Sequence, residues 1–472
     1  MPTARWYPTL ETLEDGSVIV IGGEYVPNRG SPINSTFLAD TQPANLYPLT
    51  WLLPNGMLFM QANWQTTLVN LTTHKETRLP NITHAQRTYP SSGGTAMLPL
   101  TVANNYTATI LFCGGMDPVR DDWNETLWAI AETDTSNSCV SIQPEAENPK
   151  YVDEDDLPEN RGMGNFIILP DERLFIVNGV GKGSAGYGWN TPWAINQSYA
   201  QDPVYRPAYL NLSAPSGSRW DTNLPNSTVG RLYHSSATLL PDGSVFIAGS
   251  NPNAVRPTPE WAAQDVITDE NNATYVYKTE YRAERFYPSY YDAGRPEPTG
   301  IPTSISYGGD SFDLELPKSS LNGTSLDNVK VALVRPGFST HAMQMGQRYV
   351  QLENSYTGHP NGSATLHVSQ LPPNPALLVP GPAMLFVVVD GIPSVAEFVM
   401  VGNGVVGAQP ISSPSVLATS SDARKGTSTS SSASSASSGK ADAATNGSSF
   451  TAVVGKAVAG LALLAGSLVL VA

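Results

Sequence analysis

Apolar and polar positions in the first half of the chain follow one recurring pattern. The clearest copy lies at residues 231–253, RLYHSSATLLPDGSVFIAGSNPN, where a half-apolar segment leads to Asp242-Gly243 and a continuous apolar run follows. Asp-Gly pairs favour two-residue hairpin turns, since both central residues of such a turn adopt positive φ. A short apolar run after the turn is typical of a strand that is buried on both faces. The pattern predicts a β-hairpin with Tyr233 and His234 at its head.

The same hairpin pattern recurs along the chain, and most of its copies begin with a tyrosine. The copies lie at residues 7–23, 47–63, 89–115, 162–179 and 233–249. Repeats of this length are typical of four-stranded blades around an axis, so the sequence predicts an all-β chain with a kelch-type β-propeller. The inner strands of a propeller line its central channel, and the head residues are therefore expected to converge there. A β-sandwich with coincidental turns would not repeat one pattern in this way.

The second half of the chain has a different pattern. Between residues 279 and 404, short apolar segments alternate with Pro-rich turns, and the Gly-Gly ends of the earlier repeats are absent. This arrangement predicts a small antiparallel β-sandwich of the immunoglobulin-like type. We therefore assign residues 1–278 to the propeller and residues 279–404 to the sandwich. Residues 405–449 are interpreted as a Ser/Ala-rich linker.

The C-terminal residues 450–472 are expected to be a processing signal. Asn446-Gly447-Ser448 offers three small residues, a spacer follows, and residues 457–472 are continuously apolar. A small site, a spacer and an apolar end are typical of a GPI-attachment signal. A transmembrane helix is disfavoured because the apolar run is short and no basic residues follow it. The prediction is an extracellular protein, at the cell surface or cell wall, that meets the membrane only through a lipid anchor.

Acceptor sites for N-glycosylation are dense, which also favours export. Many Asn-x-Ser/Thr sequences in loops rich in Gly, Pro and Asn are typical of a secreted glycoprotein. The acceptor residues are Asn34, Asn70, Asn81, Asn105, Asn124, Asn196, Asn211, Asn226, Asn272, Asn322 and Asn361.

Composition narrows the class of protein further. The net charge of −15 argues against nucleic acid as a partner, since phosphate backbones bind basic surfaces. The two cysteines, Cys113 and Cys139, form no Cys-x-x-Cys pair, which excludes a structural zinc site of that kind. In an exported protein we expect them to form a disulfide; the alternative is two unrelated buried thiols.

The start of the chain does not have the character of an export signal. The segment MPTARWYPTLE lacks the apolar core of a signal peptide, and the first repeat is already under way at Tyr7. We therefore expect the natural N-terminus to lie upstream of Met1.

Candidate chemistry is confined to a few tyrosines and histidines. The G-x-S-x-G, H-E-x-x-H and P-loop signatures are absent from the sequence. Two histidines stand out, His234 at a repeat head and His341 in the segment STHAMQMGQRYVQL. Together with the phenolates of Tyr7 and Tyr233 they form a ligand set that suits Cu(II). The other histidines are interpreted as surface or packing residues: His74, His84, His359 and His367.

These features together resemble the copper radical oxidases, the family of galactose oxidase and glyoxal oxidase. The resemblance covers residues 1–404 and rests on three separated motifs in the family's order. The segment Arg-Trp-Tyr-Pro-Thr at residues 5–9 and the segment LYHSSATLLPDGSVFIAGSNPN are more similar to glyoxal oxidase than to galactose oxidase. The resemblance implies a seven-bladed propeller, its first part missing here, followed by an immunoglobulin-like domain.

The resemblance also implies a role for each candidate residue. Tyr7 matches the equatorial copper ligand that becomes the tyrosyl radical, and Tyr233 matches the axial ligand that acts as the base. His234 and His341 match the two histidine ligands, the second of which reaches the centre from the sandwich domain. Tyr25 falls where galactose oxidase stacks a tryptophan over the radical site.

The implied reaction is the oxidation of a small aldehyde or alcohol by O2. For aldehydes such as glyoxal and methylglyoxal, the hydrate would lose two hydrogens to give a carboxylic acid, and O2 would leave as hydrogen peroxide. The expected protein is a monomer. In the family a cysteine on the preceding blade forms a thioether with the radical tyrosine, and that cysteine is missing upstream of Tyr7. Cys113 lies on a later blade and is a poor substitute.

Two other classes of function remain open. The chain is alternatively a catalytically inactive kelch-type propeller that serves as a cell-surface scaffold, or a propeller that binds glycans through Trp and Tyr side chains. Retention of four metal-type residues at converging positions favours the oxidase. The missing cysteine favours the scaffold.

Overall fold

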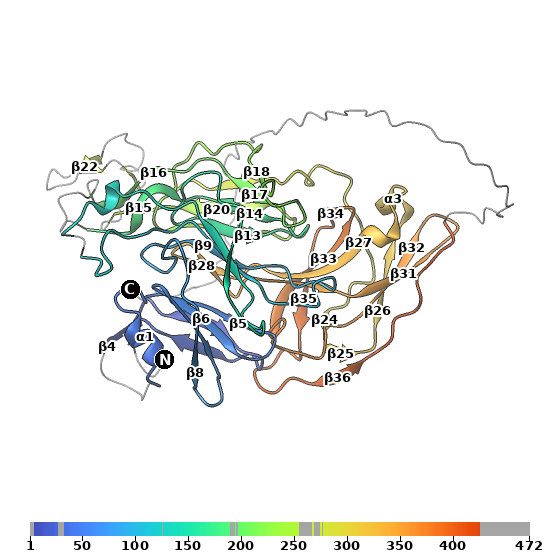
Figure 1. The fold of residues 1–472 in the computed structure, drawn as a ribbon. Coiled ribbons are helices and arrows are strands. Elements are labelled where there is room, and N and C mark those ends of the chain that lie inside the picture. Colours follow the sequence, from blue (N-terminus) through green and yellow to red (C-terminus); the bar gives the residue numbers. More distant parts are fainter. Residues whose placement is uncertain are drawn as a thin grey trace, which may run out of the picture. The chain divides into compact units, whose positions relative to one another are not determined.

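The computed structural model describes residues 4–26, 33–124, 126–188, 194, 197–253, 267–268, 274–275 and 277–424. Nearly all regular elements in these ranges are β-strands, which confirms the predicted all-β class (Figure 1). The short helices are α1 (Thr36–Asp40), α3 (Lys318–Leu321) and the 3-10 turns Ile130–Glu132 and Leu326–Asn328. Across the described ranges, no helix is both long and apolar enough to cross a membrane. The predicted anchor signal and most of the predicted linker lie outside the described residues.

Each of the repeats forms the first two strands of a separate antiparallel sheet, as the pattern predicted. The first repeat forms β2 (Thr9–Thr12) and β3 (Val18–Ile21). The next three sheets have four strands each. The second repeat begins the sheet of β5 (Leu49–Leu52), β6 (Leu58–Ala62), β7 (Gln65–Val69) and β8 (Glu76–Leu79), and the third begins that of β9 (Gly94–Met97), β10 (Ile110–Cys113), β11 (Cys139–Ile142) and β12 (Tyr151–Asp153). The fourth begins that of β13 (Asn165–Ile168), β14 (Leu174–Val177), β17 (Ala208–Leu210) and β18 (Trp220–Asp221). The last sheet has β19 (Ser235–Leu239), β20 (Val245–Gly249) and β23 (Glu284–Phe286).

Three smaller strand pairs connect or flank these sheets. They are β1 (Ala4–Trp6) with β4 (Glu24–Val26), β15 (Val180–Tyr187) with β16 (Ser198–Pro203), and β21 (Ile267–Thr268) with β22 (Thr274–Tyr275).

The hairpin turns differ in type from the prediction. In the turn at Asp242, only Gly243 has positive φ, at 79°. The N–H of Gly243 donates to the carbonyl of Leu240 at 2.9 Å, and the N–H of Leu240 donates to the carbonyl of Ser244 at 2.8 Å. These bonds define a type I turn followed by a left-handed glycine, and the first repeat makes the same turn at Asp15-Gly16 with Glu14 in place of the proline. The prediction that both central residues adopt positive φ is therefore wrong.

Buried arginines just before two of the repeats tie the strands of their blades together. Arg231 is 1% exposed and donates to the carbonyl of Gly249 at 2.7 Å and to that of Arg282 at 2.9 Å. Arg161 donates in the same way to the carbonyls of Asn178 and Arg206. Charge-assisted bonds of this kind satisfy carbonyls at strand ends that water does not reach.

The second half forms the predicted sandwich. One sheet contains β24 (Ser304–Ile305), β35 (Glu397–Val401), β33 (Gly381–Val389), β27 (Val329–Arg335), β30 (Arg348–Leu352) and β34 (Ile392–Pro393). The facing sheet contains β26 (Phe312–Leu316), β32 (Ala364–Val368), β31 (Asn354–Gly358) and β37 (Ser421–Asp422), and β25 (Tyr307–Gly309) pairs with β36 (Ile411–Pro414). Strands β36 and β37 therefore carry regular structure into the segment that was assigned to the linker.

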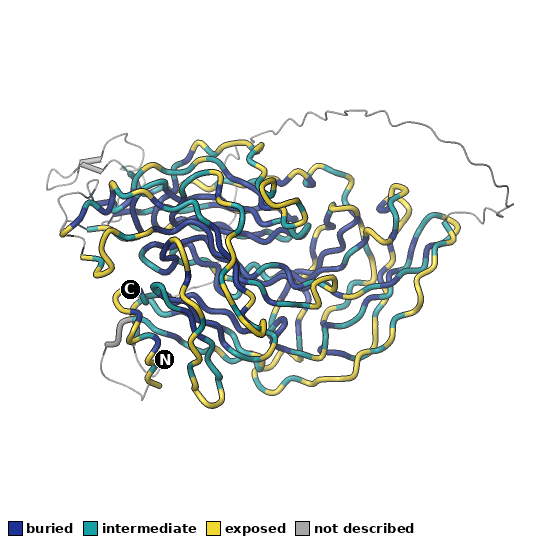
Figure 2. The backbone as a smooth tube through the Cα atoms, viewed as in Figure 1, coloured by how far each residue is buried: buried dark blue, intermediate teal, exposed yellow. Residues whose placement is uncertain are grey.

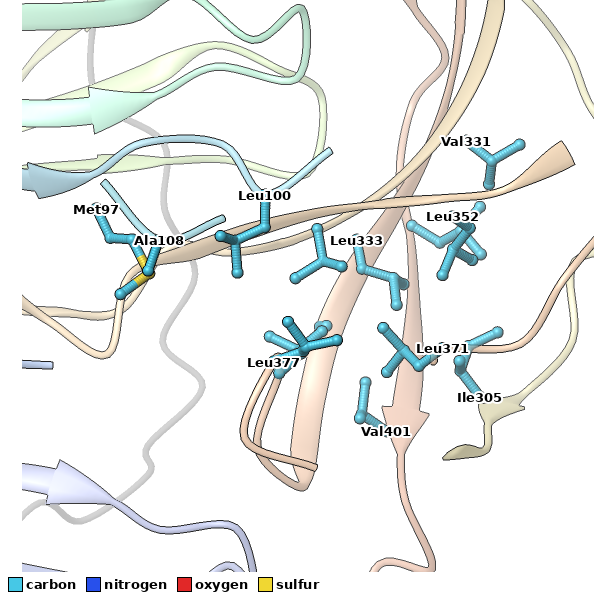
Figure 3. Packing of buried hydrophobic residues seen from close by; sticks show 14 of the residues in the cluster. Met97, Leu100, Ala108, Ile305, Val331, Leu333, Leu352, Leu371, Leu377 and Val401 are labelled. Atoms are coloured by element: carbon cyan, nitrogen blue, oxygen red, sulfur yellow. The ribbon is translucent and has the colours of Figure 1, made fainter. Parts of the chain in front are cut away.

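One hydrophobic core runs from the propeller sheets into the sandwich. Leu333 and Leu352 lie between the two sandwich sheets, and Met97 and Leu100 extend the same cluster onto a blade (Figure 3). The N–H of Leu100 also donates to the carbonyl of Tyr349 at 3.0 Å. The buried segments follow the inner strands and this junction (Figure 2). Propeller and sandwich thus share apolar contacts and a backbone hydrogen bond.

A hairpin from the sandwich enters the centre of the propeller. It consists of β28 (Phe338–Thr340) and β29 (Met343–Met345), which contact the inner strands β2, β9, β13 and β19 (Figure 1). Two buried amides hold it: Gln344 donates to the carbonyl of Ala237 at 2.6 Å, and Gln347 donates to that of Phe166 at 3.0 Å. The tip of the hairpin carries His341.

Candidate metal centre

The four residues proposed as metal ligands lie together at the centre of the propeller. The phenol oxygens of Tyr7 and Tyr233 are 3.2 Å apart. The ring of His341 lies 4.7 Å from that of Tyr7, 5.3 Å from that of Tyr233 and 4.9 Å from that of His234, measured between centroids. Residues from the first repeat, the last repeat and the sandwich hairpin therefore meet at one point.

Three of these four residues have a left-handed backbone conformation, with positive φ. Tyr7 has φ of 59°, His234 of 65° and His341 of 49°. Non-glycine residues in this region carry local strain, which persists only where the surrounding structure enforces it. At His234 the surrounding structure includes Gly249, which packs directly against the backbone of the histidine. A Cβ on Gly249 would lie 2.7 Å from the His234 carbonyl oxygen. The glycine that ends the repeat is thus needed to seat the histidine that begins it.

Both histidines are held as neutral imidazoles with one ring nitrogen available. His234 Nδ1 lies 2.9 Å from the carbonyl oxygen of Asn251, which can only accept, so Nδ1 carries the proton and Nε2 a lone pair. Burial lowers the pKa of His234, and burial together with the nearby His234 lowers the pKa of His341 to about 3. His341 Nε2 is buried and has no hydrogen-bond partner among the described residues. Neutral imidazole is the form that binds metals.

The two tyrosines are neutral phenols in the absence of a cation. Burial raises the pKa of Tyr7, and burial with the neighbouring phenols of Tyr89 and Tyr7 raises the pKa of Tyr233. A bound divalent cation favours the phenolate form, because opposite charge stabilises the ionised group. The orphaned imidazole nitrogen and the adjacent phenols fit copper, which prefers nitrogen and oxygen ligands of this type. Within the described residues no cluster of three or more His, Cys, Asp or Glu side chains offers another metal site.

Further aromatic residues surround the site, and they were not among the residues predicted from the sequence. The ring of Tyr47 stacks on Tyr7 with centroids 4.8 Å apart, and Trp6 stacks on Tyr7 at 5.0 Å. The hydroxyl of Tyr89 lies 3.5 Å from that of Tyr233. Tyr47 and Tyr89 head their repeats as Tyr7 and Tyr233 do, so the repeat pattern itself carried the signal.

Tyr25, expected to stack over the radical site, lies in β4, where its backbone pairs with Arg5. The position of its side chain lies outside what the structure describes. Its stacking role stays a prediction.

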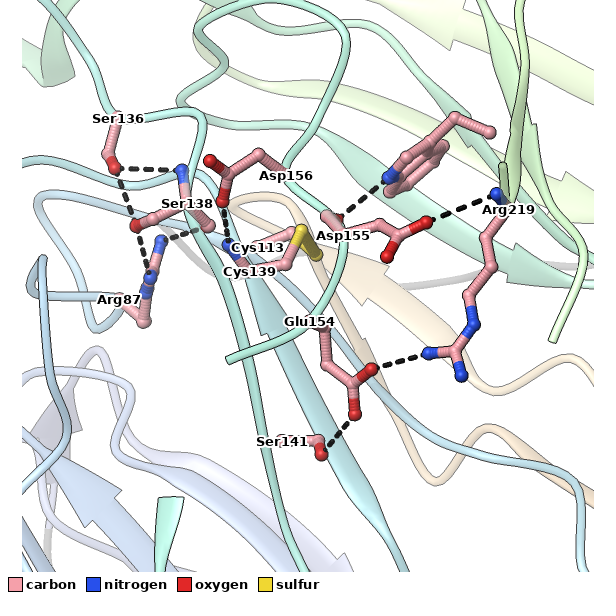
Figure 4. Close-up of a disulfide and its surroundings, with 11 residues drawn as sticks. Arg87, Cys113, Ser136, Ser138, Cys139, Ser141, Glu154, Asp155, Asp156 and Arg219 are labelled. Atoms are coloured by element: carbon pink, nitrogen blue, oxygen red, sulfur yellow. Dashed lines mark hydrogen bonds and ion pairs between the residues drawn. A yellow bond between two sulfur atoms is a disulfide. The ribbon is translucent and has the colours of Figure 1, made fainter. Parts of the chain in front are cut away.

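The two cysteines form the predicted disulfide (Figure 4). Cys113 and Cys139 are opposite each other on the neighbouring strands β10 and β11, with Cα atoms 4.1 Å apart. The buried guanidinium of Arg87 donates to the carbonyl and the hydroxyl of Ser138 beside them. Both cysteines of the chain are thus used, and neither is available to modify Tyr7.

Three of the four remaining histidines have local polar partners. His84 pairs with Asp153 at 2.8 Å. His367 contacts Thr357 at 2.9 Å in the sandwich, and His359 contacts Thr365 at 2.9 Å. These contacts agree with their interpretation as surface and packing residues.

Comparisons with known proteins agree with this arrangement. Residues 1–290 match the family model of the glyoxal oxidase N-terminus, and residues 295–401 match that of the galactose oxidase-like early set domain. A solved fungal alcohol oxidase of the AA5 family, in complex with copper, superposes with a TM-score of 0.59 at 16% identity. That match covers 85% of this chain and 76% of the other and supports the propeller-and-sandwich fold. The fold and the site together define the class of copper radical oxidases.

Several of the similar proteins are oxidases by name. The aldehyde oxidase GLOX of Vitis pseudoreticulata is 34% identical, covering 84% of this chain and 72% of that protein. The aldehyde oxidase GLOX1 of Arabidopsis thaliana is 32% identical over 84% of this chain and 63% of its own length. A galactose oxidase of Gibberella zeae is 28% identical over 85% of this chain and 55% of its own length. The chain belongs to the glyoxal oxidase family, and this membership assigns it to the oxidases.

Proposed function

We propose that the protein oxidises small aldehydes, with glyoxal and methylglyoxal as representative substrates, to carboxylic acids and releases hydrogen peroxide. The observation that carries the proposal is the convergence of Tyr7, Tyr233, His234 and His341 around the unpartnered Nε2 of His341. The names of the two plant relatives, both aldehyde oxidases, favour aldehydes over sugars as the substrate class. The overall change is RCH(OH)2 + O2 giving RCOOH + H2O2, which balances in atoms and electrons.

Copper held by the two imidazole Nε2 atoms and the two phenolates would supply a one-electron acceptor beside the substrate. We propose that the phenolate of Tyr233 accepts the proton of the substrate hydroxyl, the role that the family resemblance implies for this residue. Tyr7, 3.2 Å away, is the residue we propose to carry the radical and take the hydrogen atom from the substrate carbon. His234 and His341 would each offer an imidazole lone pair to the copper and take no part in proton transfer.

The test is a coupled peroxide and oxygen-uptake assay on the copper-loaded chain. Glyoxal and methylglyoxal are compared with galactose and benzyl alcohol, and catalase controls for the peroxide signal. Peroxide release with the aldehydes, abolished by Tyr7→Phe with copper still bound, supports the proposal. A folded, copper-loaded chain that yields no peroxide with any of these substrates overturns it.

One observation favours the alternative of a catalytically inactive surface scaffold or glycan-binding propeller. Cys113 and Cys139 are joined in a disulfide, so the thioether that the family resemblance implies has no cysteine partner within this chain. Copper binding without oxidase activity in the same assay is the outcome that supports the alternative.

We also propose that the protein is extracellular, monomeric, N-glycosylated and held at the surface by a lipid anchor. Support comes from the acceptor sites, since eight of them are exposed: Asn34, Asn81, Asn105, Asn124, Asn211, Asn226, Asn322 and Asn361. Release from intact cells by a phosphatidylinositol-specific phospholipase would support the anchor. Retention on the cells after that treatment would contradict it.

A further inference from the structure

A short side-chain network connects the proposed radical tyrosine to the histidine on the opposite domain. Thr340 Oγ1 lies 2.7 Å from His341 Nδ1. Tyr47 and Thr340 line the same cavity beside this histidine. The ring of Tyr47 in turn lies 4.8 Å from that of Tyr7 and 4.6 Å from that of His341. Three side chains from two domains thus surround one face of the candidate copper site.

A backbone hydrogen bond also holds this group of side chains in place. The N–H of Tyr47 donates to the carbonyl of Tyr7 at 2.9 Å, so the heads of the first two repeats are locked to each other. Tyr47 is 8% exposed and has φ of 47°, another left-handed head residue. A tyrosine whose backbone is held in this way keeps its ring against the imidazole of His341.

The direction of the hydrogen bond between Thr340 and His341 follows from what each atom can do. If Nδ1 of His341 accepted from Thr340, its Nε2 would carry a hydrogen that points into a buried site with no acceptor among the described residues. A buried N–H without a partner is destabilising. If Nδ1 donates to Thr340 instead, Nε2 is a bare lone pair, which a metal ion can take.

We infer that Thr340 is a positioning residue that fixes His341 in the tautomer with hydrogen on Nδ1 and a lone pair on Nε2 for copper. This inference rests on the proposed function only in taking copper as the bound metal. Partners of this kind orient a ligand and set its tautomer, and their loss typically lowers metal affinity by roughly 10- to 100-fold. Thr340 acts on the imidazole through its hydrogen bond, and the ring of Tyr47 packs against the same imidazole.

The first measurement uses the unmodified chain without metal. A two-bond 1H–15N correlation spectrum of the 15N-histidine-labelled protein reports which ring nitrogen of each histidine carries hydrogen, and His341→Gln assigns the signal. We expect His341 to be protonated at Nδ1 and bare at Nε2. A spectrum with hydrogen on Nε2 of His341 overturns the inference without any variant of Thr340.

The second measurement compares Cu(II) affinity and the nitrogen hyperfine pattern in EPR among variants. Thr340→Val is expected to weaken Cu(II) binding by roughly 10- to 100-fold, and Thr340→Ser is expected to restore it because the hydroxyl is kept. Tyr47→Phe keeps the ring stack and is expected to have a smaller effect. Thr357→Val, which removes the same kind of Thr–His contact from His367 in the sandwich, is the matched control and should leave Cu(II) binding unchanged.

The outcomes separate this inference from the proposed function. Thr340→Val that binds Cu(II) as tightly as the unmodified chain, or Thr340→Ser that fails to rescue, overturns the positioning role. A different outcome is also distinguishable: the expected tautomer and Cu(II) affinities are found, but the protein releases no peroxide with aldehydes. That outcome would leave the positioning role intact and refute the proposed oxidation.

Discussion

A buried carboxyl between the first repeat and the sandwich should make stability depend on pH in an unusual direction. Glu11, in β2, is 4% exposed, and its Oε2 accepts a hydrogen bond from Thr50 at 3.0 Å. Burial raises the pKa of Glu11 to about 7, against the opposing effect of Arg348, which is itself buried and bonded to carbonyl groups. In the unfolded chain the same carboxyl has its ordinary pKa of about 4.5.

The sign of the effect follows from which state holds the proton. Below pH 4 Glu11 is protonated in both states and favours neither. Between about pH 4.5 and 7 the unfolded chain loses this proton while the folded chain keeps it, so stability falls as the pH rises. A difference of about 2.5 units corresponds to roughly 3 kcal/mol lost by pH 8.

Replacement by glutamine removes this titration while keeping a neutral polar side chain. We expect Glu11→Gln to match the unmodified protein at pH 4.5 and to be more stable by roughly 3 kcal/mol at pH 8. The assay is urea unfolding of the copper-free proteins at pH 4.5, 6 and 8. Glu14→Gln, an exposed carboxyl in the same hairpin, is the control and should show no pH-dependent difference.

A Glu11→Gln variant that is less stable than the unmodified protein at pH 8 would refute the reasoning. That result would mean that Glu11 is ionised in the fold and that its attraction to Arg348 exceeds the cost of burial. A difference that is the same at all three pH values would also refute it, because a titrating group cannot produce it.

Two further predictions concern the supports of the site. Gly249→Ala should lower the free energy of unfolding by roughly 1–3 kcal/mol and weaken copper binding, because its Cβ would lie 2.7 Å from the His234 carbonyl. Gly217→Ala is the control: Gly217 has open space around it, and its replacement should leave copper binding intact. Replacing Cys113 and Cys139 together by serine should cost about 2–4 kcal/mol of unfolding free energy, since the bridge closes a loop with a sequence separation of 26. Thermal unfolding measures the stability loss of each variant. A variant without the disulfide whose stability is unchanged would contradict the prediction for the two cysteines.

The hairpin repeats were predictable because their signals are local. A glycine after Asp242 and an apolar run beyond it lie within a few residues of one another, and they define the hairpin whatever surrounds it. The turn type was missed because the aspartate lies at the second central position of a type I turn and the glycine follows that turn, both here and at Asp15-Gly16.

Features that depend on distant partners were out of reach. The sequence does not show that Arg231 is buried, because its acceptors at Gly249 and Arg282 become neighbours only after folding. The contact of Tyr47 with His341 likewise joins residues that lie far apart along the chain. Tyr47 itself was visible as a repeat head, but a head tyrosine reveals a contact with the centre only once the blades are placed.

The proposed ligands of the candidate site are spread over almost the whole described chain. Tyr7 stands near its start, Tyr233 and His234 past its middle, and His341 on a hairpin of the second domain. During synthesis the last of them emerges only after every described blade has been made. A nascent chain that stops before the sandwich would lack one of the four proposed ligands, so copper loading of the proposed site would require the finished polypeptide and report that both domains have assembled.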